Sequence, residues 1–594
     1  MLCRSLSRCV AVRPAAACVY RAATPENGRH PLTATSRSYA ASAEPSVVRS
    51  PFPDVEVPAV PLFQYMWQNL DRYPDRVATE CGLTGRRYTY AEARTAARNF
   101  AGALVGAGLG PGHVLSVFLP NCPEFPIVVL GANEAGVVVT TTNPKYTAEE
   151  LSKQLRDCRP SAAVTTPALH GTVVRAFQEA GLPPPRLLVT VPAAASSTAL
   201  DPGATPEGAA DFQQLVQRAA PEGELPGALT SPDQVFIMPY SSGTTGLPKG
   251  VMLSNRNIVA NLQQAREPAI QYSDVDSDGV CSADDAIPVV LPMFHIYGLS
   301  VVMLQKFSLG AKLVTLPKFE PQLYLDVLAK HKPQLLFLVP PMVLFLGGHP
   351  MVQRRHLESV RFVVSGAAPA GQMDIDRFLE RASPATSFIQ AYGLTEASPC
   401  VLNSERTTKK QTAVGKPLPN TSVRVVDVET SRVLGPNQPG EIVTKGPQVM
   451  LGYYNNAKAT AETLSADGWL RTGDIGYYDA DSDFYIVDRI KELIKVKGFQ
   501  VPPAELEEIL RSHPAVEEAA VVGVPDERSG EVPRAYVVLK KKAQQVVTPQ
   551  DVAKFVDAKV ADYKKLAGGV HFIDAIPKNP SGKILRRVLK QQTR

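Results

Sequence analysis

The sequence lacks any hydrophobic run long enough to cross a membrane. A spanning helix needs about 18 or more consecutive apolar residues. The richest apolar stretch, residues 335–346, is short and is interrupted by Pro340 and Pro341. We expect this stretch to form a buried strand followed by a turn, and we expect no transmembrane segment.

Cysteine is sparse and shows no metal-binding spacing. The chain has 8 cysteines, of which Cys3, Cys9 and Cys18 lie near its start, and none belongs to a CxxC or Cys/His pattern. The sequence therefore predicts free thiols and no zinc. The 52 prolines form neither a Gly-X-Y period nor a low-complexity tract, which excludes collagen-like and wholly disordered chains.

The formal net charge of the chain comes entirely from its first 50 residues. Residues 1–50 contain seven arginines, no lysine and only Glu26 and Glu44 as acids, which accounts for the whole formal charge of +5. An Arg-rich, acid-poor leader is typical of a mitochondrial transit peptide. We expect residues 1–45 to direct the chain to the mitochondrial matrix, with cleavage after Tyr39. The alternatives are a disordered leader or a misassigned start, with a cytoplasmic protein. Because the rest of the chain is formally neutral, we expect no general affinity for nucleic acid.

The hydrophobic pattern predicts an α/β fold. A helical period at residues 90–104 alternates with short Val-rich strands at residues 114–119 and 136–141. This rhythm is typical of layered, mostly parallel sheets with helices, which we assign to a large lobe over residues 46–487. The β-rich last hundred residues predict a small, separate α+β lobe. Within it, Thr548 with Asp551 three positions later is a variant capping box that predicts the start of a helix.

A candidate phosphate-binding loop follows an apolar strand at residues 235–240. It reads Ser241-Ser-Gly-Thr-Thr-Gly-Leu-Pro-Lys249-Gly250. Glycines let backbone N–H groups converge on a phosphate, hydroxyls add donors, and the lysine adds charge. It is not a Walker A loop, because Pro248 and Gly250 stand where that motif needs Gly and Ser or Thr. The alternative is a flexible polar turn.

Five motifs in order resemble the signatures of the adenylate-forming, AMP-binding (ANL) superfamily. After the loop come Tyr392-Gly-Leu-Thr-Glu396, Thr472-Gly-Asp474, the run from Asp488 to Gln500, and Pro580-Ser-Gly-Lys583-Ile. A further segment, Leu291-Pro-Met-Phe-His-Ile-Tyr297, is most similar to 4-coumarate:CoA ligases and their insect relatives. Five ordered motifs are far more specific than a lone glycine loop.

The resemblance implies a two-step reaction with ATP, magnesium and coenzyme A. A carboxylate and ATP form an acyl-adenylate and pyrophosphate, and the CoA thiol then takes the acyl group and releases AMP. It also implies a hinge at residues 488–491 and a small mobile lobe at residues 492–594, which presents two faces in turn.

The resemblance further implies the nucleotide site. Lys583 would neutralise the α-phosphate as the acid attacks, Thr395 would contact that phosphate, and Glu396 would hold magnesium. The other implied ATP or AMP contacts are Ser241, Ser242, Gly243, Thr244, Thr245, Gly246, Lys249, Ala367, Gln390, Ala391, Asp474, Arg489, Lys491 and Lys495.

The CoA and acyl sites are implied in the same way. Lys491 occupies the hinge position, and the segment from Lys495 to Gly498 would replace Lys583 in the second step. His295 would gate the channel between the acyl pocket and the adenylate. The implied CoA contacts are Lys318, Lys497 and Gly498. The implied acyl pocket contains Tyr297, Gly298 and Gly366, with a wall changed from the plant ligases at Ser398 and Cys400.

The sequence therefore predicts an acid:CoA ligase that acts on an aryl-propenoic, medium-chain or related carboxylic acid. A luciferase-like monooxygenase shares every adenylation motif and stays open as an alternative. A domain that loads a carrier protein is disfavoured, because we see no carrier-like segment after the small lobe. A non-catalytic binding protein is disfavoured as well, because the charged residues of the chemistry are all present. The oligomeric state is not predicted.

Overall fold

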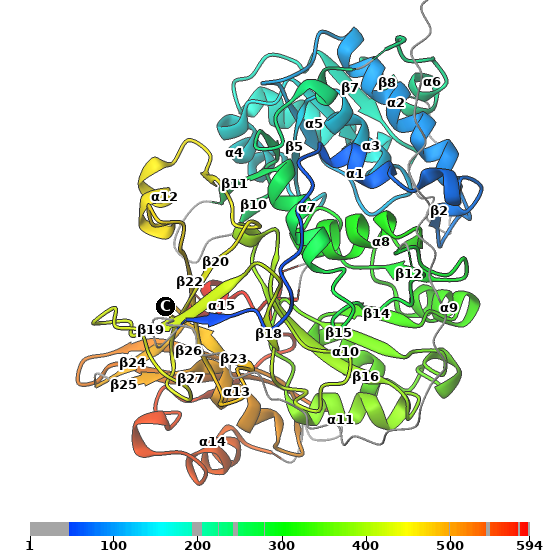
Figure 1. The fold of residues 1–594 in the computed structure, drawn as a ribbon. Helices are drawn as coiled ribbons and strands as arrows, with labels where there is room; N and C mark the ends of the chain where they lie inside the picture. Colours follow the sequence, from blue (N-terminus) through cyan, green and yellow to red (C-terminus); the bar gives the residue numbers. More distant parts are fainter. Residues whose placement is uncertain are drawn as a thin grey trace, which may run out of the picture. The chain divides into compact units, whose positions relative to one another are not determined.

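The computed structural model describes residues 47–192, 205–223, 225–241, 248–277, 279–497, 499–541, 547–579 and 582–591. The predicted transit peptide, the loop residues Ser242, Gly243, Thr244, Thr245 and Gly246, and Gly498 lie outside the described residues. The predicted α/β class is confirmed, since sheets alternate with helices along the chain (Figure 1).

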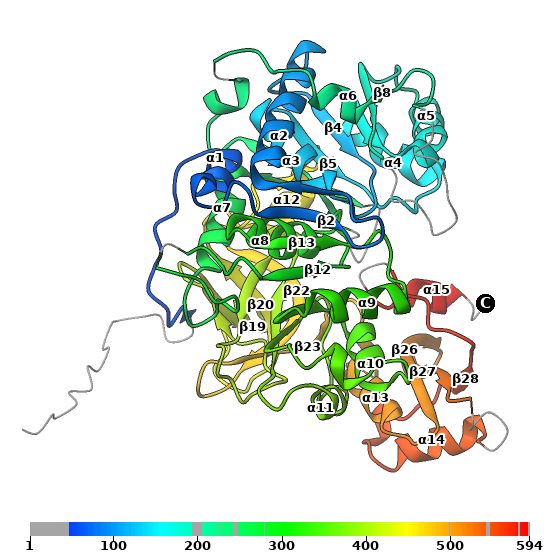
Figure 2. The same ribbon diagram turned by 90° about the vertical axis from the view of Figure 1, so that its right-hand side faces the viewer.

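A nine-stranded mixed sheet forms the first layer of the large lobe. Its strands run in the order β10-β11-β9-β5-β4-β6-β7-β8, with β21 beside β11. From β9 to β8 in this order, each strand is parallel to its neighbour. In both views α2 and α3 lie side by side, close to β5 (Figures 1 and 2). Helix α2 begins at a capping box between Thr89 and Glu92. The elements are α2 (Tyr90–Gly106), β4 (Val114–Val117), α3 (Glu124–Glu134), β5 (Val138–Thr141), α4 (Ala148–Cys158), β6 (Ala162–Thr165), α5 (His170–Glu179), β7 (Leu187–Thr190), β8 (Ala210–Asp211), α6 (Phe212–Val216), β9 (Val235–Ile237), β10 (Tyr240–Ser241), β11 (Lys249–Ser254) and β21 (Gly452–Tyr453).

Two smaller sheets continue the large lobe. They have the orders β12-β13-β2-β3 and β14-β15-β16-β17-β18, and each combines parallel pairs with antiparallel edge strands. The elements are α1 (Leu62–Trp67), β2 (Val77–Cys81), β3 (Arg87–Thr89), α7 (Asn255–Gln264), β12 (Ala286–Val289), α8 (Gln305–Ser308), β13 (Lys312–Thr315), α9 (Pro321–His331), β14 (Leu335–Leu338), α10 (Pro340–Gly348), β15 (Phe362–Ser365), α11 (Gln372–Arg381), β16 (Ser387–Gly393), β17 (Cys400–Asn403) and β18 (Lys416–Pro417).

The apolar stretch at residues 335–346 corrects one expectation. Its first part is the buried strand β14, as predicted, but the expected turn is the start of helix α10. Pro340 stands in the first turn of α10, where a missing N–H costs no hydrogen bond and the fixed φ favours helix. Two prolines at this place therefore begin a helix rather than break the chain direction.

A third part of the large lobe is an entirely antiparallel sheet, an arrangement that the alternating pattern did not indicate. Its strand order is β1-β19-β20-β22-β23. The elements are β1 (Val48–Arg49), β19 (Ser422–Val426), β20 (Gly440–Lys445), α12 (Ala457–Thr463), β22 (Leu470–Tyr478) and β23 (Phe484–Arg489).

The residues after β23 form the C-terminal lobe, defined as residues 492–591, with hydrophobic clusters of its own. Its sheet has the order β25-β24-β27-β26, with β28 parallel to β27. The expected capping box of Thr548 and Asp551 opens helix α14. The lobe boundaries at residues 487 and 491 stay a prediction. The elements are β24 (Ile494–Val496), β25 (Phe499–Val501), α13 (Pro503–Arg511), β26 (Val516–Asp526), β27 (Gly530–Leu539), α14 (Pro549–Asp557), β28 (Val570–Phe572) and α15 (Arg586–Gln591).

Two further features of the described residues bear on the predictions. Within them, no helix combines the length and the apolarity that a membrane crossing requires. Their cysteines are buried free thiols, at positions 81, 122, 158, 281 and 400.

Candidate active site

A cavity of about 2180 Å³ opens where three of the four sheets of the large lobe meet the C-terminal lobe. Its walls include the end of β10, the start of β11, the end of β16, the antiparallel strands β22 and β23, and the segment before α15. Many predicted site residues line it, although their motifs are spread over more than half the chain. These are Ser241, Lys249, His295, Tyr297, Gly366, Ala367, Ala391, Thr395, Glu396, Asp474, Arg489, Lys491 and Lys583.

Six other predicted residues that the structure describes lie away from the cavity walls. Ser398, expected in the acyl-pocket wall, is fully buried, and its hydroxyl donates to the carbonyl oxygen of Gln448. The Gln390 side chain is buried and is bonded to the backbone of Ala370 and Gln411. Gly298 is packed so closely that an added Cβ would stand 2.1 Å from the carbonyl oxygen of Pro292. The other three, Lys318, Lys495 and Lys497, are exposed lysines.

Asp474 lies on β22 directly opposite Arg489 on β23. The two are register partners in the antiparallel pair, and the Arg489 Nε lies 3.2 Å from a carboxylate oxygen of Asp474. The other carboxylate oxygen accepts a hydrogen bond of 2.6 Å from the Tyr392 hydroxyl. Asp474 is only 6% exposed. A buried carboxylate fixed by two neighbours can accept hydrogen bonds from paired hydroxyls, such as those of a ribose.

Lys583 brings a cation from the C-terminal lobe into the cavity. The Asn579 side chain accepts a 2.9 Å hydrogen bond from its backbone N–H, which fixes the turn that carries it. Burial lowers the pKa of Lys583 to about 8, with the Arg489 charge acting in the same direction and Asp474 and Glu396 opposing it. Lys583 therefore titrates near physiological pH.

His295 lines the same cavity as a neutral imidazole. Burial, with a smaller contribution from the Lys583 charge, lowers the pKa of His295 to about 3. A ring that stays uncharged beside a cation can gate or position a group, but it does not act as a cationic acid at neutral pH.

Glu396, in a 3-10 turn at Thr395–Ala397, is a carboxylate that suits a hard cation. One of its oxygens accepts a 2.9 Å hydrogen bond from the Tyr453 hydroxyl, and the structure gives the other no partner among the described residues. The Lys249 ammonium lies 4.7 Å from the centre of the Tyr453 ring. Carboxylate oxygens are the ligands that magnesium prefers, so this donor set fits that ion.

One part of the cavity wall carries no charged side chain. We define the acyl arm by six lining residues that carry no charged side chain: Tyr272, Tyr297, Gln305, Phe337, Cys400 and Asn403. The rings of Tyr297 and Phe337 meet edge to face at 6.3 Å, and a Cβ on Gly366 would stand 3.2 Å from the Tyr297 ring. Burial raises the pKa of the Cys400 thiol to about 12, so this thiol is uncharged at neutral pH.

Several of these contacts were missed from the sequence. Tyr392 opens a motif that was recognised, so its place at the site could have been anticipated. Tyr453 contacts Glu396 across 57 positions of the chain and stands in no motif, and Asn403 and Tyr272 gave no signal either. Only the folded chain brings these side chains to the cavity.

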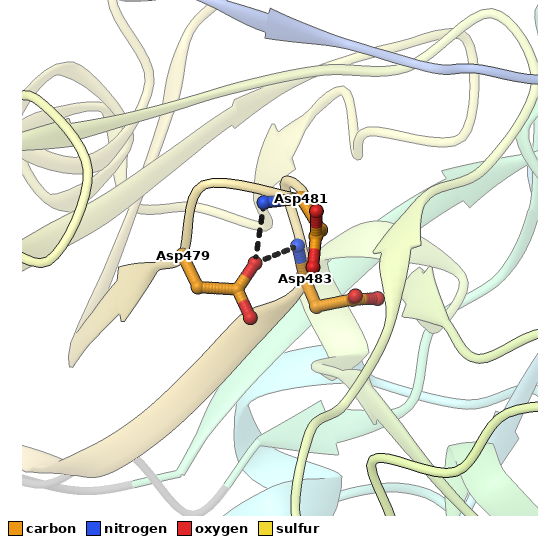
Figure 3. Close-up of side chains that lie close together, drawn as sticks. All are labelled: Asp479, Asp481 and Asp483. Atoms are coloured by element: carbon orange, nitrogen blue, oxygen red, sulfur yellow. Dashed lines mark hydrogen bonds between the residues drawn. The ribbon is translucent and has the colours of Figure 1, made fainter.

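A cluster of three aspartates elsewhere in the large lobe resembles a metal site. Asp479, Asp481 and Asp483 lie together in the turn between β22 and β23, where Asp479 accepts the backbone N–H groups of the other two (Figure 3). The Lys410 ammonium contacts all three carboxylates at 2.6, 2.8 and 2.9 Å. The lysine occupies the place that a cation would take, so the cluster is an ion-pair network.

Comparison with protein-family models gives two matches in this chain. Residues 66–454 match the family described as AMP-binding enzyme, and residues 505–583 match the AMP-binding enzyme C-terminal domain. The second match contains Lys583.

Curated relatives cover almost the whole chain. A protein named 4-coumarate--CoA ligase 2 from Oryza sativa subsp. japonica is 39% identical over 92% of this chain and 95% of its own length. One named 4-coumarate--CoA ligase 3 from the same species is 40% identical over 93% and 95%. A third, 4-coumarate--CoA ligase 2 from Solanum tuberosum, is 38% identical over 92% and 96%.

Solved structures of the same fold include ligand-bound enzymes. ATP-bound MatB from Rhodopseudomonas palustris is 27% identical, with a TM-score of 0.78 over 90% of this chain and 99% of that one. The o-succinylbenzoate CoA synthetase MenE from Bacillus subtilis, in complex with its acyl-adenylate intermediate, is 27% identical, with a TM-score of 0.73 over 89% and 98%.

Proposed function

Since this chain belongs to the AMP-binding enzyme family and is an AMP-forming acid:CoA ligase, we propose that its substrate is an aryl-propenoic or medium-chain carboxylic acid. One observation carries the proposal. The acyl arm lines the same cavity as Lys583, Asp474 and Arg489, so the tail of a carboxylic acid and a nucleotide can share one cavity. The names of the relatives favour an aryl-propenoic acid.

In the first step a carboxylate oxygen of the acid attacks the α-phosphorus of ATP. The new bond joins acyl oxygen to phosphorus, and the bond to the β-phosphate breaks with release of pyrophosphate. Negative charge increases on the phosphoryl oxygens, and Lys583 is the cation that we assign to stabilise it. Asp474 and Arg489 hold the ribose, Thr395 donates to the α-phosphate, and Lys249 with the loop before it binds the outer phosphates.

Magnesium is a proposed cofactor, and Glu396 is the residue that would hold it. When bound, the ion supplies charge compensation between the phosphates. Tyr453 orients this carboxylate by donating to one oxygen, which leaves the other for the ligand.

In the second step the CoA thiol attacks the acyl carbon, the carbon–oxygen bond to AMP breaks, and AMP leaves. We assign this step to a second orientation of the C-terminal lobe, with Lys491 at the hinge. Lys495 and Lys497 are exposed on that lobe outside the cavity, which supports a second face that faces the substrate only after rotation. The assignment of Lys318 to the CoA nucleotide belongs to the same proposal.

The test is the product of the complete reaction. With acid, ATP, magnesium and CoA, the enzyme is expected to form acyl-CoA and AMP in equal amounts, with or without oxygen. A product that requires oxygen and carries no CoA would instead support the luciferase-like alternative.

We also propose a mitochondrial matrix location, on the basis of the arginine-rich composition of residues 1–45. A fluorescent protein fused behind residues 1–50 is expected to accumulate in mitochondria. The control fusion carries the same segment with its arginines changed to glutamine. Cytosolic signal from the unmodified fusion would contradict the proposal.

A further inference from the structure

A hydrogen-bond conflict in the acyl arm determines which way an amide faces. The Tyr272 hydroxyl oxygen lies 2.6 Å from the Asn403 side-chain oxygen and also 2.6 Å from the carbonyl oxygen of Ser404. Burial raises the pKa of Tyr272, so the phenol keeps its proton. A phenol has one proton and cannot donate to both oxygens.

The conflict is removed if the amide nitrogen of Asn403 faces the phenol. The Tyr272 hydroxyl then donates to the carbonyl of Ser404 and accepts from the Asn403 nitrogen. The oxygen and nitrogen of a side-chain amide are assigned from such hydrogen-bond networks. The carbonyl oxygen of Ser404 can only accept a hydrogen bond, so the phenol must donate to it. The Asn403 oxygen is thereby left at the far end of the amide.

The far end of this amide has no partner among the described residues, although Asn403 is only 7% exposed and lines the cavity. Gln305 repeats the pattern. Its nitrogen donates to the carbonyl of Ala265, while the structure gives its amide oxygen no partner among the described residues. Neither atom is completely buried, so each is open to the cavity, where a ligand that supplies a donor gains a hydrogen bond.

We propose that Asn403, held by Tyr272, is a specificity-determining residue that accepts a hydrogen bond from a hydroxyl or amino group on the tail of the acid. This inference rests on the proposed function. It narrows the substrate to a carboxylic acid whose tail is uncharged and apolar, apart from one donor group remote from the carboxylate. Gln305 offers a second acceptor in the same arm.

The charge of the acyl arm excludes a different tail. None of its six residues is charged, and the free ends of its amides are acceptors. The buried Lys306 ammonium lies 5.6 Å from the centre of the Phe337 ring, but Lys306 does not line the cavity. A second carboxylate on the substrate would therefore meet acceptor oxygens with no cation among the six lining side chains, and its desolvation would go uncompensated. We therefore expect dicarboxylic acids to be poor substrates.

The test compares acids that differ only in the donor group. Three pairs are used: cinnamate and 4-coumarate, 3-phenylpropionate and its 4-hydroxy derivative, and octanoate and 8-hydroxyoctanoate. For each pair, kcat/KM in carboxylate-dependent pyrophosphate exchange gives a ratio of hydroxylated to unsubstituted acid. In the wild-type enzyme we expect this ratio to be about 10 or more for at least one pair.

The variant Asn403→Leu keeps the size of the side chain and removes the amide. It is expected to lower the ratio to about 1, because the hydroxylated acid loses its acceptor and the unsubstituted acid has no such hydrogen bond to lose. The variant Tyr272→Phe removes the group that orients the amide and is expected to lower the ratio as well. If Asn403→Leu loses all activity, Tyr272→Phe decides the question on the same ratio.

Two outcomes would overturn the inference and leave the proposed function intact. They are a wild-type ratio near 1 for every pair that is activated, and a ratio that neither variant changes. Failure to activate any of the six acids is a different result, because it contradicts the proposed substrate class itself.

Discussion

Lys583 combines two demands that oppose each other. The proposed chemistry needs its positive charge, whereas burial of the side chain disfavours that charge and lowers its pKa to about 8. A lysine with this pKa loses its proton just above neutral pH.

We therefore expect adenylation to decline as pH rises. Below about pH 8 the free enzyme holds Lys583 charged, and above it the neutral amine predominates, so kcat/KM for pyrophosphate exchange should fall through about pH 8. In Lys583→Arg, whatever activity remains should show no such fall, because a guanidinium stays charged. An identical alkaline limb in both proteins would assign the titration to another group.

Removal of the cation should separate the two half-reactions. Lys583→Ala is expected to reduce pyrophosphate exchange by about 100-fold or more and to leave thioester formation from a supplied acyl-adenylate largely intact. The matched control is Lys565→Ala, since that exposed lysine of the same lobe pairs with Asp562 outside the cavity. Equal loss of both half-reactions would show that Lys583 has a general structural role.

The sequence predicted residues whose motif is local and missed those that depend on distant partners. Lys583, Asp474 and Arg489 stand in short recognisable segments. Asn403 becomes interesting only because Tyr272, 131 positions earlier, is folded against it. Gln390 is a residue that its motif predicted wrongly. Its side chain makes hydrogen bonds to the backbone of Ala370 and Gln411 and does not line the cavity.

At the scale of elements, helix α13 of the C-terminal lobe is joined to helix α11 of the large lobe by one ion pair. Arg511 lies 2.7 Å from Asp374, which is only 4% exposed. A rotation of the C-terminal lobe would break this pair, so it stabilises the arrangement in which Lys583 is in the cavity.

Removal of this pair should shift the balance between the two steps. Arg511→Ala is expected to slow pyrophosphate exchange by about threefold to tenfold, the effect of about 1 kcal/mol on a conformational equilibrium, without slowing thioester formation from supplied adenylate. The control Lys564→Ala removes a pair with Glu505 on the same helix but within one lobe. Slowing of both steps to the same extent would indicate lost stability rather than a shifted equilibrium.

Strands and helices with clear periodicity were predictable, and elements set by long-range pairing were not. The capping box of Thr548 and Asp551 predicted the start of α14, and the period at residues 90–104 predicted α2. The antiparallel sheet of β19, β20 and β22 was not predicted, because strand direction depends on partners far along the chain. Pro340 misled the prediction, since a helix-starting proline and a turn proline look alike in sequence.

At the scale of the whole molecule, the excess positive charge and the cations of the active site lie in different parts of the chain. The net charge of +5 is confined to the first 50 residues, which lie largely outside the described part of the chain. In the described chain, cations gather at the cavity: Lys249, Arg489, Lys491 and Lys583 line it together. This division predicts small anionic ligands and not an extended polyanion as the partner.

The central claim is that the acid becomes an acyl-adenylate before it becomes a thioester. It is tested by supplying an acid whose two carboxylate oxygens are ¹⁸O, together with ATP, magnesium and CoA, and by measuring the mass of the AMP formed. One labelled oxygen should move to phosphorus in the first step and stay there when the carbon–oxygen bond breaks in the second. The AMP is therefore expected to carry one ¹⁸O; unlabelled AMP, or ADP as the nucleotide product, would contradict adenylation of the acid.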